Sequence, residues 1–190
     1  MKRIVIAANH VGLVFNKEQL VKVLTTGTHW VGFGGRVECY NMSEPFLPKQ
    51  EINVLLQHPD LAALVEVFEV GDFELALLYK DGHYRQTLTA GQFVFWKGAN
   101  TYSVTKAQLN DLYIGDNIDK NLLEKGVLNA FILKYRLEAF EKGVLMVNGA
   151  LVRTLEAGNY FFWKNSDVVT VLKTDMRQMT IDIGGQEVLT

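Results

Sequence analysis

The residues with the clearest capacity for chemistry are four histidines and one cysteine. His10, His29, His58 and His83 are scattered, and no pair has the i, i+4 spacing of a helical zinc site. Cys39 has no histidine close in sequence that could activate it, and a lone cysteine can form neither an internal disulfide nor a cysteine-rich zinc site. We therefore expect no metal and no cofactor, and we predict that Cys39 is a buried structural thiol in a strand.

Other motifs that could carry catalysis are incomplete. The glycine-rich run 32–36 lacks the Gly-Lys-Ser/Thr ending of a phosphate loop. The segment 116–119 lacks the ligand pattern of an EF-hand, and Asp119 is more typical of a helix N-cap. The chain has no Gly-x-Ser-x-Gly nucleophile motif. The sequence therefore predicts a protein that is not an enzyme.

Two aromatic segments are the strongest candidates for a functional surface. Each combines aromatic residues with a following lysine, and two interpretations stay open. The segments are core strands, or they form a patch for a membrane surface or a partner groove, where tryptophan beside lysine is common. The candidate interface residues are Phe95, Trp96 and Lys97 in one segment and Phe162, Trp163 and Lys164 in the other.

The composition is that of an ordinary soluble domain. Hydrophobic residues make up 48% of the 190 residues and charged residues 21%. The formal net charge of -2, without a dense basic stretch, argues against a nucleic-acid partner. No apolar run approaches the length of about 20 residues that spans a bilayer. We expect a cytoplasmic protein, with association to a membrane surface as an alternative.

The elements that hold these residues belong to an internal repeat. The stretch that starts at Glu74 matches the stretch that starts at Glu141: Gly91 falls on Gly158 and 158 − 91 = 67. The same offset holds upstream and downstream without a gap, which predicts a duplication. A third, more diverged copy starts at His10, with an offset of 91 − 27 = 64.

Each copy has the pattern of an antiparallel sheet. A first strand (12–16, 76–80, 143–147) meets a two-residue turn, and a second strand follows (84–88 and 151–155 in the later copies). Asp-Gly and Asn-Gly turns at 81–82 and 148–149 are typical of type I′ hairpins, whereas the turn at 17–18 should differ. A glycine turn then leads into the aromatic strand, and a fourth strand is predicted at 168–172 with a continuation over 176–183. The structural turn residues are Gly27, Gly82, Gly91, Gly149 and Gly158, of which Gly91 and Gly158 should have positive φ.

Two helical segments are predicted between the copies, at 51–65 and 119–132. Leu61, Leu64 and Val65 have i, i+3, i+4 spacing, and Pro59 and Gly126 should divide each segment into two turns. The predicted fold class is strand-rich α+β, with three tandem β-repeats, as small barrels or sheets, joined by short helices. The expected organisation is 1–50, 51–118 and 119–190.

The third copy resembles the start of the SPFH domain of stomatin, prohibitin and slipin proteins. The resemblance is carried by Arg153, Leu155, Gly158, Phe162-Trp163, Asp175, Arg177 and the Gly185–Thr190 stretch. It looks closest to bacterial slipin-type proteins, and it implies that the chain is an N-terminal fragment of a longer protein. The stomatin membrane segment is missing from this chain. The resemblance also implies homo-oligomerisation and contact with a membrane surface or a membrane protease.

Two functions follow as expectations. The first is a non-enzymatic assembly or scaffold module that is monomeric or weakly associating alone and forms a large homo-oligomer in the full-length protein. The alternative is a ligand-binding β-module that recognises a peptide or a saccharide in shallow pockets made by the repeats.

Overall fold

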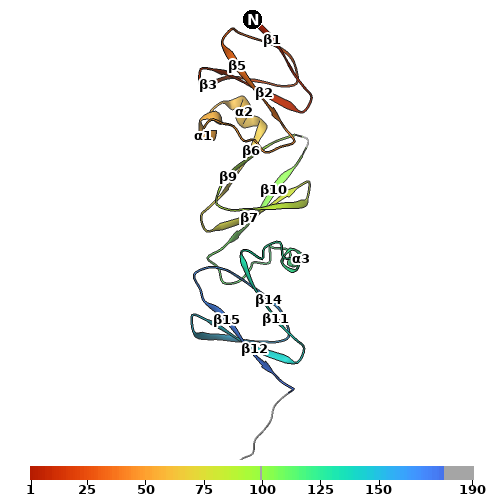
Figure 1. Cartoon of the computed structure of the whole chain (residues 1–190), viewed down its shortest axis with the longest axis vertical. Coiled ribbons are helices and arrows are strands. Elements are labelled where there is room, and N and C mark those ends of the chain that lie inside the picture. The colour runs from red at the N-terminus through yellow and green to blue at the C-terminus, as the bar shows by residue number, and fades with distance from the viewer. Residues whose placement is uncertain (99, 178–190) are drawn as a thin grey trace, which may run out of the picture. The chain divides into compact units, whose positions relative to one another are not determined.

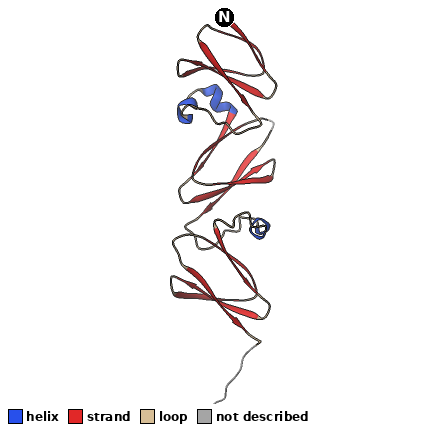
Figure 2. Cartoon of the chain, in the orientation of Figure 1, coloured by secondary structure: helices blue, strands red, loops and turns tan. Residues whose placement is uncertain are grey.

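The computed structural model describes residues 1–98 and 100–177 (Figures 1 and 2). Within them the chain forms fifteen strands and three short helices. The strands are β1 (Lys2–Ile6), β2 (His10–Asn16), β3 (Gln19–Leu24), β4 (Gly27–Val31), β5 (Gly35–Asn41), β6 (Val65–Val70), β7 (Glu74–Lys80), β8 (His83–Leu88), β9 (Gly91–Trp96), β10 (Tyr102–Gln108), β11 (Ile132–Leu137), β12 (Glu141–Val147), β13 (Ala150–Leu155), β14 (Gly158–Trp163) and β15 (Val169–Asp175). The helices are α1 (Ile52–Leu55), α2 (Pro59–Leu64) and α3 (Lys120–Glu124).

The strands form three copies of one five-stranded unit. Repeat 1 contains β1–β5, repeat 2 contains β6–β10 and repeat 3 contains β11–β15. In each repeat the first strand pairs with the fourth in a two-stranded antiparallel sheet, and the second strand lies between the third and the fifth in a three-stranded sheet. The strand-rich α+β class and the three tandem repeats are therefore confirmed.

The hairpin of the three-stranded sheet is reproduced in detail. Its register shifts between Val14 and Phe15 in repeat 1, between Leu78 and Tyr79 in repeat 2, and between Leu145 and Met146 in repeat 3. These positions obey the sequence offsets, since 78 − 14 = 64 and 145 − 78 = 67. A bulge adds local twist to a hairpin, so its recurrence shows that the copies share backbone detail as well as strand order.

The hairpin turn of repeat 1 differs from those of repeats 2 and 3, as the sequence predicts. Asp81 and Gly82 have φ of 52° and 78°, and Asn148 and Gly149 have φ of 51° and 81°, which is the positive pair that a type I′ turn requires. In repeat 1 Lys17 has a φ of 56°, but Glu18 is not among the residues with positive φ. The first turn therefore differs at its second position.

The glycine that opens the fourth strand also has a left-handed backbone in every copy. Its φ is 134° at Gly27, 148° at Gly91 and 152° at Gly158, which confirms the predicted sign. Side chains with a Cβ rarely adopt this conformation.

We expect Gly158→Val to lower the free energy of unfolding of repeat 3 by about 1–3 kcal/mol, because a β-branched residue is strained at this φ. Hydrogen exchange of the β12–β14 amides would measure the change. Ala157→Val, at the exposed neighbouring position, is the matched control. Equal stability of the two variants would show that the positive φ at Gly158 has no energetic weight.

The two sheets of each repeat approach each other at one small residue of the central strand. A Cβ at Gly12 would lie 2.6 Å from Ile6 Cδ1, and a Cβ at Gly143 would lie 2.6 Å from Leu137 Cδ2. Repeat 2 has Ala76 at this position, fully buried, and its partner is the shorter Val70. The extra methyl group on one sheet is thus matched by a smaller side chain on the other.

This size match predicts a compensating pair in repeat 3. Gly143→Ala alone should lower the free energy of unfolding by about 1–3 kcal/mol, the usual cost of overpacking. Adding Leu137→Val, which reproduces the pair of repeat 2, should recover part of that loss. A double-mutant cycle from urea unfolding measures the coupling, and additive effects would contradict the size match.

Three strands and the extent of the helices differ from the sequence prediction. β1, β6 and β11 were not predicted, and β6 and β11 start inside segments that were predicted to be helical. Pro59 does begin a second helix, and Gly126, with a φ of 76°, follows α3 closely. Asp119 caps α3 as predicted, since its Oδ1 accepts a hydrogen bond from the Asn121 amide at 2.8 Å. Of the predicted continuation 176–183, residues 178–183 lie outside the described residues.

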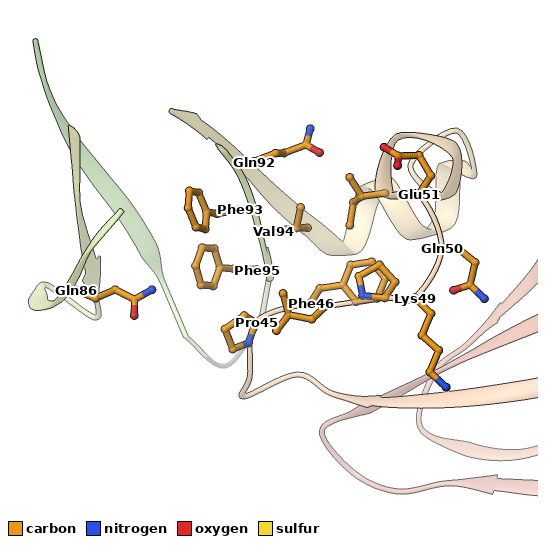
Figure 3. A pocket seen from close by; sticks show the side chains of 13 residues that line it. Pro45, Phe46, Lys49, Gln50, Glu51, Gln86, Gln92, Phe93, Val94 and Phe95 are labelled. Atoms are coloured by element: carbon orange, nitrogen blue, oxygen red, sulfur yellow. The ribbon is translucent and has the colours of Figure 1, made fainter. Parts of the chain in front are cut away.

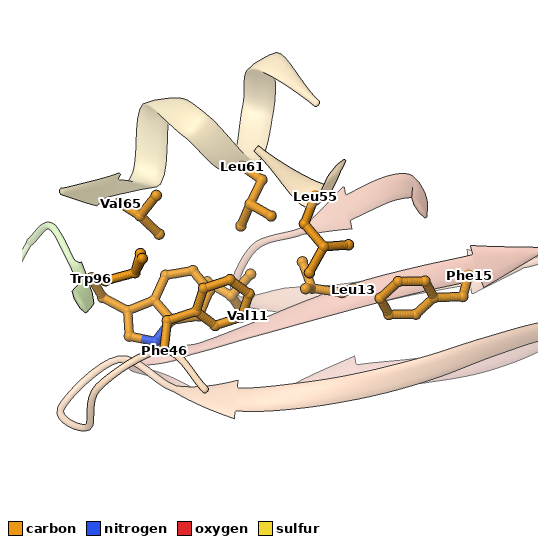
Figure 4. Close-up of a cluster of buried hydrophobic side chains, with 9 residues drawn as sticks. Val11, Leu13, Phe15, Phe46, Leu55, Leu61, Val65 and Trp96 are labelled. Carbon is orange, nitrogen blue, oxygen red and sulfur yellow. The ribbon is translucent and has the colours of Figure 1, made fainter. Parts of the chain in front are cut away.

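The chain divides into two compact units after Lys106. The first unit contains repeat 1, α1, α2 and repeat 2 up to Lys106 in β10, and its core joins both repeats (Figure 4). β2 supplies Val11, Leu13 and Phe15, the connecting segment supplies Phe46, Leu55 and Leu61, and repeat 2 supplies Val65, Val94 and Trp96. We call this cluster the junction core.

Candidate functional site

The four aromatic rings of the predicted surface segments lie in the core. Phe95 and Phe162 are 3% and 1% exposed, and Trp96 and Trp163 are each 1% exposed. Trp96 packs against Phe46, with ring centroids 4.6 Å apart, and Phe95 stacks on Tyr102 at 4.5 Å on the opposite face of β9. The strand is therefore covered on both faces, and the core interpretation of these rings holds.

The two lysines that follow the aromatic strands are exposed. The Lys97 amide donates to the Leu64 carbonyl at 2.8 Å, which fastens the end of β9 to the end of α2. Lys164 Nζ donates to the Asn129 carbonyl oxygen at 3.0 Å. Its ammonium group thus satisfies the turn before β11 rather than forming a patch with Trp163.

The residues that could do covalent or metal chemistry stay apart. Cys39 lies in β5 as predicted, but it is exposed, so the expected burial of the thiol is wrong. Across residues 1–98 and 100–177, no group of three histidine, cysteine or carboxylate side chains could hold a metal ion. None of the helices in this described part is long and apolar enough to cross a membrane.

An exposed apolar surface does lie on the three-stranded sheet of repeat 3. Leu151 is 68% exposed and Leu172 is 54% exposed. Leu172 lies directly opposite Val144, and Leu151 lies opposite Met146, so the four side chains share one face of the sheet. Val144 and Met146 are half-buried. We call these four residues the outer face of repeat 3.

The central strand of this face is fully buried in repeat 1. Val144 and Met146 correspond to Leu13 and Phe15, since 144 − 13 = 131 and 146 − 15 = 131, the sum of the two offsets. Leu13 and Phe15 are 0% exposed because the connecting segment and repeat 2 pack on them in the junction core. The outer face of repeat 3 is thus the counterpart of a surface that this fold uses to hold another repeat.

Repeat 1 exposes the counterparts of the residues that repeat 2 contributes to the junction core. Val65 and Val94, which repeat 2 inserts into the junction core, correspond to Met1 and Trp30 at the offset of 64. Met1 is 68% exposed and Trp30 is 59% exposed, and the neighbouring Phe33 is 91% exposed. We call Met1, Trp30 and Phe33 the leading edge of repeat 1.

A groove runs along the edge of repeat 2, beside β9 (Figure 3). It encloses about 500 Å³ and is lined by the segment 45–52, by β9 and by Gln86 of β8. The rings of Phe93 and Phe95 point to the same side of β9, and Pro45 and Phe46 belong to the segment that runs beside β9 (Figure 3). Gln86, Gln92 and Gln50 give this wall neutral polar groups. We call it the first groove.

Repeat 3 has an equivalent groove. It encloses about 340 Å³, and Tyr113, Arg153 and Asn159 take the places of Phe46, Gln86 and Gln92 at the offset of 67. The Arg153 guanidinium lies over the Tyr113 ring, 5.6 Å from its centroid. This contact spans the second groove, which explains its smaller volume.

The second groove is also the more charged one. A hydrogen bond from Lys134 to Glu124 (Nζ–Oε2 2.6 Å), together with one from Asn159 (Nδ2–Oε1 2.8 Å), lowers the pKa of the Glu124 carboxyl. Glu124 therefore remains an anion that binds these two side chains, and it holds Asn159 at the groove wall.

The comparisons give no relative for this chain: no protein-family model matches it, and no curated protein and no solved structure matches it. The residues of the outer face and the leading edge were missed by the sequence analysis, whereas of the groove residues it named Phe95 and Phe162 as candidate interface residues. The repeat offsets contain a signal for the first two, because they place Trp30 on Val94 and Val144 on Leu13.

Proposed function

We propose that this chain is a non-enzymatic assembly module that associates with further copies of itself. The observation that carries the proposal is the outer face of repeat 3, whose counterpart in repeat 1 is buried by the next repeat. Isolated apolar surface residues are common, but a contiguous exposed apolar group is typical of an interaction site.

A second copy is the partner that fits this face best. Repeat 2 contributes Val65, Val94 and Trp96 to the junction core beside the connecting segment, and the leading edge of repeat 1 is the counterpart of this repeat 2 surface. The contact would join two different surfaces, so it is heterologous and can continue from copy to copy as an open chain.

The association of the chain alone should be weak. The proposed contact uses the outer face and the leading edge, whereas the junction core also includes Phe46, Leu55 and Leu61 of the connecting segment. The interface is therefore at the small end of the usual range, with a Kd on the order of 0.1–1 mM.

The resemblance to SPFH proteins extends this proposal to a scaffold at a membrane surface or around a membrane protease. This extension is supported by residues that lie in or beside the strands of repeat 3: Arg153, Leu155, Gly158, Phe162, Trp163, Asp175 and Arg177. The Gly185–Thr190 stretch lies outside the described residues. The assembly proposal itself depends on the two exposed surfaces and not on this resemblance.

Sedimentation equilibrium at protein concentrations from roughly 10 µM to 1 mM, a range that brackets the expected Kd, tests the proposal. The average mass should rise with concentration for the wild type and stay at the monomer value for Leu172→Glu, which places a charge in the outer face. Val54→Glu changes a 60% exposed apolar residue of α1 and should associate like the wild type. A wild type that stays monomeric over the whole range would end the assembly proposal.

A further inference from the structure

One edge of β9 pairs with β6, and the other edge pairs over a short length with the segment 45–46 of the same chain. Pro45 forms an antiparallel bridge with Phe95, and the Phe46 amide donates to the Val94 carbonyl at 2.8 Å. Since Val94 uses this edge, alternate residues of β9 present their main-chain groups to the same side. Gln92 is the next such residue toward the start of the strand.

The chain's own strand stops before it reaches Gln92. In an antiparallel pair the residue opposite Gln92 would be Pro48, because 46 + 2 = 48 and 94 − 2 = 92. Proline has no amide hydrogen and cannot donate to the Gln92 carbonyl. The segment therefore leaves the strand at this point, and the N–H and C=O of Gln92 face the first groove.

Apolar and neutral polar groups make up most of the lining at this edge, together with Lys49 and Glu51. Phe93 and Phe95 line the groove with part of their rings, and Gln86 approaches from β8. Gln50 Oε1 is buried and accepts no hydrogen bond from the described residues. Gln92 Nε2 is held by Asn53 Oδ1 at 3.1 Å and Glu69 Oε1 at 3.4 Å, which keeps the Gln92 side chain on the wall of the groove.

We propose that the first groove binds a short extended peptide, which pairs with Gln92 and places an apolar side chain beside Phe93 and Phe95. Addition of a strand to a free sheet edge obtains affinity from main-chain hydrogen bonds and specificity from side-chain pockets. The occupant continues the pairing that Pro45 and Phe46 begin on the same edge. A volume of about 500 Å³ is in the range of small ligand sites.

The second groove, in repeat 3, can be compared directly with the first groove in repeat 2. Its Arg153 guanidinium lies over the Tyr113 ring and the groove is smaller, whereas the shorter Gln86 is the counterpart of Arg153 in the larger first groove. The peptide should therefore prefer repeat 2. Gln86→Arg copies the covered groove into repeat 2, and Arg153→Gln copies the uncovered groove into repeat 3.

Titration of the ¹⁵N-labelled chain with the blocked tetrapeptide acetyl-Thr-Phe-Val-Thr-amide tests the proposal by NMR. We expect the Gln92 amide signal to shift with a Kd on the order of 0.1–1 mM, the range of a short peptide with few main-chain bonds. An analogue with N-methylated Phe and Val keeps both side chains and should bind at least tenfold more weakly. Cellotriose, the saccharide probe, should leave the Gln92 signal unchanged.

The two variants should change binding of the tetrapeptide in opposite directions. Gln86→Arg should weaken the tetrapeptide at least tenfold, with the rest of the spectrum unchanged, and Arg153→Gln should add a shift at Asn159. The proposal is overturned if the tetrapeptide leaves Gln92 unshifted at millimolar concentration, or if the N-methylated analogue binds equally well. A shift caused by cellotriose alone would assign the groove to a saccharide instead.

Discussion

Trp96→Ala should lower the free energy of unfolding of the first unit by about 3–5 kcal/mol, the usual cost of truncating a fully buried aromatic residue. The indole is 1% exposed and fills the centre of the junction core, with the Phe46 ring 4.6 Å away and the Tyr40 ring 6.2 Å away. Because the connecting segment and both neighbouring repeats contact this cluster, no single element can close the cavity alone.

Urea unfolding followed by circular dichroism measures this effect. Trp30→Ala is the matched control, since Trp30 is 59% exposed in the equivalent strand of repeat 1 and its loss should change stability by less than about 0.5 kcal/mol. A Trp96 variant as stable as the Trp30 variant would mean that the junction core does not hold repeats 1 and 2 together.

Leu13→Ala should cost about 3–5 kcal/mol, and the loss should be felt in both repeats of the first unit. Leu13 is 0% exposed in β2 of repeat 1, yet it belongs to the same cluster as Val65, Val94 and Trp96 of repeat 2. In repeat proteins stability is the sum of repeat terms and nearest-neighbour interface terms, and this residue belongs to the interface.

Native-state hydrogen exchange can separate these terms. The slowest amides of β2 and of β9 should lose protection by the same free energy, because both strands depend on the junction core. Leu47→Ala, at a 79% exposed position of the connecting segment, is the control and should leave both strands unchanged. Loss of protection in β2 alone would show that the two repeats unfold independently.

The repeat is well predicted from the sequence because its turn motifs are local and each occurs in two copies. The turn at Asp81 is a strong hairpin signal by itself, and its recurrence at Asn148 with a constant offset makes the assignment robust. The alternation of β9 also predicts its burial on two faces, since Val94 and Trp96 join one cluster while Phe93 and Phe95 join another.

The missed strands show where a local pattern misleads. Leu61, Leu64 and Val65 have helical spacing, but α2 ends at Leu64 and Val65 begins β6. The segment 65–70 reads Val-Glu-Val-Phe-Glu-Val, so its alternation changes phase at Phe68 and gives only a weak strand pattern, which the preceding helical spacing obscured. Its pairing with β9 is a tertiary contact, and no local signal reports it.

The candidate surfaces could not be predicted for a related reason. The first groove exists because Pro48 ends a pairing that depends on how the segment 45–52 meets β9. Cys39 illustrates the same limit. It shares a face of β5 with Val37, which packs against the core of repeat 1, yet the Cys39 thiol itself is exposed.

In the proposed head-to-tail assembly the leading edge of one copy binds the outer face of another, and one mixing experiment tests this contact most directly. Trp30→Glu blocks the leading edge and Leu172→Glu blocks the outer face, so each variant keeps one intact surface. Sedimentation equilibrium at about 1 mM, above the expected Kd, should find each variant monomeric alone, whereas the equimolar mixture should form dimers and nothing larger. Dimers of Trp30→Glu alone would show that two outer faces pair with each other, and a mixture that stays monomeric would contradict head-to-tail assembly.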